Sequence, residues 1–186
     1  MTRERSDRKG PERPRRNAPE RPNRDAPERP FAGWLDEKEL RAWRGLQLMQ
    51  NQLSAALNRE LTDSAGLSYI DYLVLAALTD RPDGRMRAFE LGRELGWEKS
   101  RVSHHISRMS ERGLVERQKC SEDRRGAHVA ITKLGRKTIE NAAPGHVASV
   151  RRRFLDLLSK EEVQTLAGVS ETVLAGLAGE CEALDD

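Results

Sequence analysis

The chain has 186 residues, of which 37% are hydrophobic and 34% are charged, and its formal net charge is +3 at pH 7. This length fits one domain with a tail. No apolar run is long enough to span a membrane and no secretory signal begins the chain, so we expect a cytoplasmic protein that has no membrane partner. The two cysteines, Cys120 and Cys181, are too few for a disulfide framework or a four-ligand zinc site.

Positive charge is concentrated in one segment of the chain. Residues 85–137 hold 14 Lys or Arg against 7 Asp or Glu, whereas residues 31–84 and 138–186 have net charges of −3 and −5. A solvated surface does not require this segregation. The distribution therefore favours a polyanionic partner for residues 85–137.

Residues 1–33 are predicted to form a disordered tail rich in Pro and Arg. The motif Pro-Glu-Arg-Pro recurs with a period of eight, starting at Pro11, Pro19 and Pro27. Pro blocks helix formation, and a segment with so few apolar residues cannot bury enough surface to fold. The excess of Arg could add non-specific phosphate contacts, and the alternative is a passive tail.

A long amphipathic helix is predicted within residues 34–66. Asp36 followed by Glu39 is typical of a capping box at a helix start. The helix is expected to run to about Thr62, with one apolar stripe that consists of Leu46, Met49, Leu53, Leu57 and Leu61. Such a stripe buries itself against the same chain or against a partner.

Two shorter helices follow, separated by a turn. Ser68 is predicted to cap a helix that ends at Leu78, and Pro82-Asp83-Gly84 is a turn signal. The next helix spans residues 88–95. Gly96 is expected to end it, because only Gly adopts a positive φ at little cost.

A helix that starts at Lys99 or Ser100 and ends at Gly113 is the predicted recognition helix. Its core-facing positions recur at helical spacing, at Val102, Ile106 and Met109. The other side carries groups that can hydrogen-bond to bases or phosphates: Lys99, Ser100, Arg101, His104 and Arg108. A recognition helix presents such groups to the major groove of duplex DNA.

Residues 114–117 and 127–131 are predicted to pair as an antiparallel hairpin, the wing, around a charged turn. A basic turn beside a recognition helix can reach the narrow minor groove, whose negative potential attracts Arg. Asp123 is expected to hold one Arg by a bidentate ion pair and so to aim the other. The sequence leaves open which of Arg124 and Arg125 enters the groove.

Two helices are predicted at the C-terminal end of the chain. The first starts at Lys133 and continues to about Leu158, with a kink at Pro144. Ser159 with Glu162 is expected to cap the last helix. Its apolar stripe consists of Val163, Leu166, Val169, Val173, Leu174 and Leu177.

From about Asp36 to Leu177 the chain resembles the MarR family of bacterial transcription regulators. The resemblance rests on five segments in order: LSYIDYLVL (67–75), RGLV (112–115), DRRG (123–126), ITKLGR (131–136) and LSKEE (158–162). It implies a mainly α fold with a small β-hairpin wing. Residues 67–132 would form a winged helix–turn–helix lobe, and residues 34–66 and 133–186 would supply the helices of a dimerisation base.

The resemblance also implies a homodimer with a small-molecule cleft between lobe and base. It points to Ser100, Arg101 and His104 as base or phosphate contacts, and to Asp123, Arg124 and Arg125 at the wing. A ligand in the cleft would change the spacing of the recognition helices and lower the affinity for DNA. The aromatic candidates to line this cleft are Trp43, Tyr69 and Tyr72, and the alternative is that they are core residues.

The sequence thus predicts a sequence-specific transcription regulator that binds a pseudo-palindromic operator in double-stranded DNA. It is expected to be a repressor released by a small-molecule effector or another signal. One alternative is a weakly specific architectural DNA-binding protein aided by the basic tail, and another is a winged helix used for protein contacts alone.

No enzyme, cofactor or metal site is predicted. Gly84, Gly92 and Gly96 lack the spacing of a phosphate-binding loop. His104 and His105 do not share a helix face, as metal ligands at i and i+4 would. His104 is expected to point at DNA, and His105 to pack at the edge of the lobe.

Overall fold

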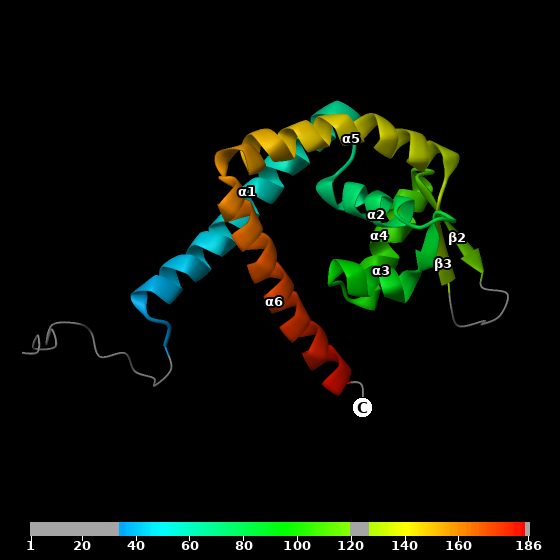
Figure 1. The fold of residues 1–186 in the computed structure, drawn as a ribbon. Coiled ribbons are helices and arrows are strands. Elements are labelled where there is room, and N and C mark those ends of the chain that lie inside the picture. Colours follow the sequence, from blue (N-terminus) through cyan, green and yellow to red (C-terminus); the bar gives the residue numbers. More distant parts are fainter. Residues whose placement is uncertain (1–33, 120–126, 185–186) are drawn as a thin grey trace, which may run out of the picture. The chain divides into compact units, whose positions relative to one another are not determined.

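The structure is a computed structural model that describes residues 34–119 and 127–184, so the predicted tail lies outside the described residues. The described residues fall into two units, of which the first ends at Leu40 and the second begins at Arg41. In chain order the elements are α1 (Glu37–Ala65), α2 (Tyr69–Thr79), β1 (Arg85–Arg87), α3 (Ala88–Leu95), α4 (Lys99–Glu111), β2 (Val115–Lys119), β3 (Ala127–Ile131), α5 (Lys133–Arg153), a 3-10 turn (Leu155–Leu157) and α6 (Lys160–Leu184) (Figure 1).

In the first unit, the described residues form the start of α1. The Asp36 N–H donates to Glu39 Oε2 at 2.7 Å, and the Glu39 N–H donates to Asp36 Oδ1 at 2.9 Å. These reciprocal bonds satisfy N–H groups that have no partner within the helix. The predicted capping box at Asp36 is therefore confirmed.

The core of the second unit lies where α2, α3 and α4 meet the small sheet, as the grouping of these elements in Figure 1 shows. The three positions of α4 that were predicted to face this core, Val102, Ile106 and Met109, are buried. They pack with buried apolar side chains from the other elements: Leu61, Leu67, Val74, Leu75, Leu78, Met86, Leu91, Leu114, Val115, Val129 and Ile139. Burial of this surface is what holds the helices on the sheet.

The sheet has three antiparallel strands in the order β1-β3-β2. The predicted hairpin is present as β2 and β3, with Val115 paired to Ile131. Strand β1, in which the buried Met86 pairs with Val129, was not predicted. Three residues are too few to show the alternation by which strands are recognised. Helices α3 and α4 with this sheet form a winged helix–turn–helix.

The turn between α3 and α4 forms at Gly96, as predicted. Gly96 has φ +64°, which is the left-handed conformation that other residues rarely adopt. The Trp97 N–H donates to the Gly92 carbonyl at 2.8 Å, and the Gly96 N–H donates to the Arg93 carbonyl at 3.2 Å. These two bonds form a Schellman motif, which ends α3 sharply and sets the start of α4.

Helix α5 starts against the backbone of Gly113 and Leu114, which directly precede β2. The Thr132 hydroxyl accepts a hydrogen bond from the Gly135 N–H at 3.0 Å and donates to the Gly113 carbonyl at 2.6 Å. A Cβ atom on Gly135 would lie only 2.0 Å from the carbonyl oxygen of Leu114. Gly135 is therefore required by the close approach of two backbone segments.

Helix α5 continues through Pro144 and ends at Arg153, before the predicted end near Leu158, and a 3-10 turn follows. The predicted cap of α6 is confirmed, because the Ser159 N–H donates to Glu162 Oε2 at 2.8 Å and the Glu162 N–H donates to Ser159 Oγ at 3.2 Å. Within residues 34–119 and 127–184, no helix is both long and apolar enough to cross a membrane.

Replacing Gly135 with Ala is expected to lower the free energy of unfolding by more than about 3 kcal/mol, since the new methyl group overlaps a backbone oxygen. Urea denaturation measures this change. Gly145 of the same helix is the matched control, because nothing lies within 4 Å of a Cβ atom there. Gly145→Ala should raise stability by up to about 1 kcal/mol, and a Gly135→Ala protein as stable as this control would contradict the close approach.

Candidate nucleic-acid interface

The five residues predicted to contact DNA from the recognition helix all lie on the exposed side of α4. We call this the recognition face; it consists of Lys99, Ser100, Arg101, His104 and Arg108. The other side of the helix is buried, and its residues are Val102, His105, Ile106 and Met109. Burial of one side therefore leaves the other side free to meet a ligand.

Arg101 is held by an aromatic ring from the turn that precedes α4. Its guanidinium carbon lies 4.7 Å from the centroid of the Trp97 ring, which is a cation–π contact. The Trp97 ring is in turn edge-on to His105, with centroids 5.5 Å apart. Trp97 was not among the predicted contacts, although the spacing of four residues from Trp97 to Arg101, and of four more to His105, was a usable signal.

A buried carboxylate fixes α4 to the start of α2. Asp71 Oδ1 lies 2.9 Å from His105 Nε2, and Arg112 Nη1 donates to Asp71 Oδ2 at 2.7 Å. Asp71 also accepts from the Ser68 N–H at 2.9 Å, which completes the cap of α2. Only 3% of Asp71 and 6% of His105 are exposed, so His105 packs inside the lobe and faces α2.

The partners of Asp71 decide its charge. Burial raises the pKa of this carboxyl group, but the hydrogen bonds from His105, Arg112 and Ser68 outweigh burial and lower the pKa well below its ordinary value of 3.8. Asp71 is therefore ionised at neutral pH. The guanidinium of Arg112 also donates to the Gly66 carbonyl at 2.7 Å, which brings the junction of α1 and α2 into the same network.

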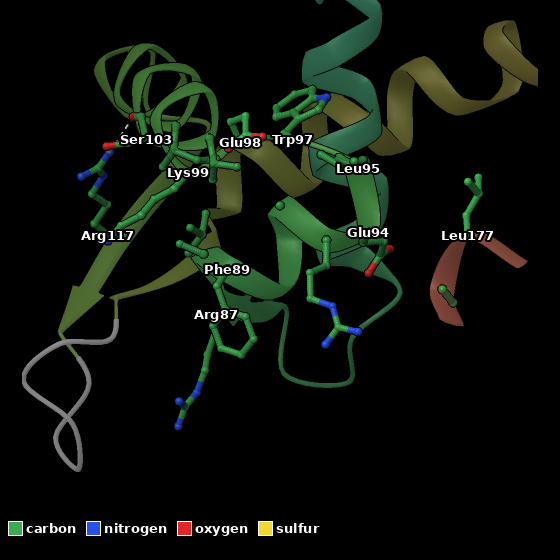
Figure 2. Close-up of a pocket in the computed structure, with 18 of the residues that line it drawn as sticks. Arg87, Phe89, Glu94, Leu95, Trp97, Glu98, Lys99, Ser103, Arg117 and Leu177 are labelled. Carbon is green, nitrogen blue, oxygen red and sulfur yellow. Dashed lines mark hydrogen bonds between the residues drawn. The ribbon is translucent and has the colours of Figure 1, made fainter. Parts of the chain in front are cut away.

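Strand β2 of the wing is hydrogen-bonded to the recognition helix through Arg117, which was not among the predicted contacts. Arg117 of β2 donates through Nη2 to the Ser103 carbonyl at 2.6 Å and to the Ser107 hydroxyl at 3.0 Å. Figure 2 shows Arg117 reaching Ser103 across the space between strand and helix. The wing therefore starts from a strand that is anchored to α4. The wing residues Asp123, Arg124 and Arg125 themselves lie outside the described residues.

A groove of about 1020 Å³ opens beside the N-terminal end of α4. Its wall includes the aromatic side chains of Phe89 and Trp97, and Leu177 of α6 also lines it (Figure 2). Arg87 and Arg117 line the groove together with Lys99 of the recognition face. Positive charge thus extends from the recognition face to Arg87 of β1 and Arg117 of β2, although Glu94 and Glu98 also line the groove.

The structure brings two of the three candidate cleft residues together. The rings of Tyr72 and Tyr69 on α2 lie 4.1 Å and 6.0 Å, between centroids, from the ring of His146 on α5. Burial raises the pKa of Tyr72 and lowers the pKa of His146. Trp43 lies on α1 with 52% of its surface exposed. His146 belongs to this cluster, although it was not predicted to lie beside the two tyrosines.

The carboxylates near the recognition face have structural partners. Glu90 Oε2 accepts from the Arg87 N–H at 3.0 Å and so caps α3, and Glu94 forms an ion pair with Arg81 at 2.8 Å. Among the residues with described side chains, no cluster of three or more His, Cys, Asp or Glu could hold a metal ion.

Asp71→Asn is expected to lower the free energy of unfolding at neutral pH by about 2–4 kcal/mol, since it leaves buried donors without their charged acceptor. Because the pKa of Asp71 is lower in the folded state than its ordinary 3.8, its contribution is complete above pH 3.8 and is lost as the pH falls further. Urea denaturation of wild type and variant across this range measures both effects.

Asp63→Asn, at an exposed position of α1, is the control for that experiment and should change stability little. Equal stabilities of Asp71→Asn and wild type at neutral pH would contradict the role given to the buried carboxylate. A difference in the free energy of unfolding between wild type and Asp71→Asn that grows as the pH falls below 3.8 would also contradict this role.

Comparison with known proteins agrees with this geometry. The family model described as MarR family matches residues 65–126. The chain is 32% identical, over 123 residues, to the transcriptional regulator HosA of Escherichia coli O127:H6. This alignment covers 66% of the chain and 86% of HosA.

Two solved structures from Streptomyces coelicolor show the same fold. AbsC, a MarR family transcriptional regulator, is 37% identical with a TM-score of 0.75, and the match covers 80% of this chain and 99% of AbsC. Sco3205, a MarR family transcriptional regulator solved in complex with DNA, is 32% identical with a TM-score of 0.75, and the match covers 80% of this chain and 92% of Sco3205. The chain therefore belongs to the MarR family of transcriptional regulators.

Proposed function

We propose that this protein binds a pseudo-palindromic operator as a homodimer and recognises its sequence through the major groove. The observation that carries this proposal is the recognition face, whose arginines are exposed and held from below by Trp97 and His105. In a dimer, two such helices would lie about one turn of DNA apart, on the order of 34 Å. The proposal implies a cytoplasmic location.

Charge and likeness to a relative both support DNA as the partner. Residues 85–137 carry 14 Lys or Arg against 7 Asp or Glu, and the groove beside α4 adds Arg87 and Arg117 to the positive surface. Neutralising phosphates with such groups supplies most of the affinity for DNA, and base contacts supply the specificity. Sco3205 was solved in complex with DNA. We assign Asp123, Arg124 and Arg125 to the minor-groove contact as part of this proposal.

Exposed apolar surface on the long helices supports a homodimer. More than half of the surface of each of four apolar residues of α6 is exposed: Val169, Val173, Leu174 and Leu177. Apolar residues of α1 are exposed as well, including Trp43, Leu46, Leu48 and Met49. Patches of this kind mark interaction surfaces. We therefore assign residues 34–66 and 133–186 to the dimerisation base and residues 67–132 to the DNA-binding lobe.

We further propose that the protein is a repressor that a small molecule or another signal releases from DNA. The cluster of Tyr69, Tyr72 and His146 joins α2 of the lobe to α5 of the base. A ligand that moved these helices relative to each other would change the spacing of the recognition helices, and the dimer could then no longer fill both half-sites. Trp43 remains a candidate for the same cleft.

Arg101→Ala and His104→Ala are each expected to weaken binding to an operator duplex by about 1–3 kcal/mol and to relax its base preference, since each removes a proposed base contact. Competition binding against duplexes changed at single base pairs measures both effects. Lys160→Ala, at an exposed position at the start of α6, is the control and should bind as the wild type does.

A chain that lacks residues 1–33 should keep the sequence preference of the full chain under this proposal. If deletion removes most of the affinity, while Arg101→Ala and His104→Ala leave binding unchanged, the protein is instead an architectural DNA-binding protein that depends on its tail.

Val173→Glu is expected to shift the protein from dimer to monomer in analytical ultracentrifugation, because it places a charge in the proposed apolar interface. Gln164→Glu adds the same charge to an exposed position of α6 that lies outside the apolar stripe, and should leave the dimer intact. A wild type that sediments as a monomer at micromolar concentration would contradict the proposed homodimer.

A further inference from the structure

We infer that His105 is a positioning residue of the DNA interface: it fixes the guanidinium of Arg108 on the recognition face, and Asp71 of α2 fixes His105. This inference rests on the proposed function, because it assumes that the recognition face binds DNA. It assigns a role in recognition to a buried histidine that cannot itself reach a base.

The contact between His105 and Arg108 determines where the histidine carries its proton. Arg108 Nη2 lies 2.9 Å from His105 Nδ1. A guanidinium has only donors, so Nδ1 must be the acceptor and carry no hydrogen. The two residues are three positions apart on α4, which is the spacing at which side chains on a helix meet. Neutral His105 therefore has its proton on Nε2.

Asp71 favours the same tautomer from the other side of the ring. His105 Nε2 lies 2.9 Å from Asp71 Oδ1, although the N–H direction is not aligned for an ideal hydrogen bond. An ionised carboxylate only accepts, so its negative charge 2.9 Å from Nε2 favours a proton on that nitrogen over an exposed lone pair. The partner of one ring nitrogen thus decides whether the other nitrogen is a donor or an acceptor. In His105, Asp71 favours the proton on Nε2, and Nδ1 is left to accept from Arg108.

Packing keeps the histidine ring from turning away from either partner. His105 is 6% exposed, and the Trp97 ring meets it edge-on with centroids 5.5 Å apart. Asp71 is itself held by Arg112 and by the cap at Ser68. Asp71 and His105 are therefore each buried and held by further contacts, whereas the side chain of Arg108 reaches the exposed side of α4.

A buried anchor of this kind matters for binding because Arg has many rotamers. Ordering a long side chain when DNA binds costs conformational entropy, and an arginine that is already in place avoids part of this cost. A histidine needed only to place a ring between Asp71 and Trp97 would not require a partner at its second nitrogen. The second nitrogen of His105 instead contacts a residue of the recognition face.

Two substitutions of His105 separate its two contacts. In His105→Asn, the side-chain oxygen can take the place of Nδ1 and accept from Arg108, but the side chain is too short to reach Asp71. In His105→Gln, the amide nitrogen can take the place of Nε2 and donate to Asp71, but no acceptor remains at the position of Nδ1. Thermal unfolding establishes that both proteins are folded before binding is measured.

The experiment measures how much Arg108→Ala weakens binding to an operator duplex in each background. We expect a loss of about tenfold in the wild-type background and in His105→Asn, and of less than about twofold in His105→Gln, where Arg108 is already unanchored. A loss that is the same in His105→Gln as in the wild type overturns the inference. The inference is also overturned if the wild-type protein binds its operator selectively and the single substitution Arg108→Ala leaves that affinity unchanged.

A second measurement does not need DNA. The ¹⁵N chemical shifts of the His105 ring, assigned by their disappearance in His105→Asn, should show a protonated Nε2 and an unprotonated Nδ1 at neutral pH. A protonated Nδ1 overturns the inference. Failure of the proposed function has a different signature, since wild type, Arg108→Ala and both His105 variants would then bind every duplex with the same weak affinity.

Discussion

The buried carboxylate of Asp71 is the interaction on which the position of the recognition helix depends. It contacts His105 in the middle of α4 and Arg112 at the end of α4, and it caps α2 through Ser68. A buried charge is costly unless its partners satisfy it. Here every contact with Asp71 comes from a group that donates a hydrogen bond or carries positive charge. Any shift of α4 along α2 would therefore break several of these contacts at once.

The recognition face, which is the proposed DNA-binding surface, lies directly above this buried layer. Arg101 lies over Trp97, Arg108 contacts His105, and Arg117 crosses from β2 to Ser103. Each of these side chains is long and flexible, yet each is held by a group of the turn before α4 or of α4 itself. Such pre-ordering reduces the entropy lost on binding and favours one arrangement of donors over others. In this way a network of buried polar contacts determines the geometry of an exposed basic surface.

Local signals in the sequence predicted most of the helices, and contacts between distant segments could not be predicted. The end of α3 followed from Gly96, and the buried side of α4 followed from the spacing of Val102, Ile106 and Met109. The three residues of β1 are a strand only because β3 lies beside them. In the polar network, Asp71 and its partner Arg112 are 41 residues apart in the sequence, and Arg117 and its partner Ser103 are 14 residues apart. No periodic pattern encodes such pairs, so the site was predicted as a list of exposed residues without the residues that hold them.

The measurement that tests this account most directly is the selection of bound sequences from a random duplex library at near-physiological salt. A dimer with two recognition helices should enrich an inverted repeat whose half-sites lie about one helical turn apart, on the order of 10 base pairs between centres. Tight binding without enrichment of any sequence would contradict the account, because the ordered recognition face would then have no sequence to recognise.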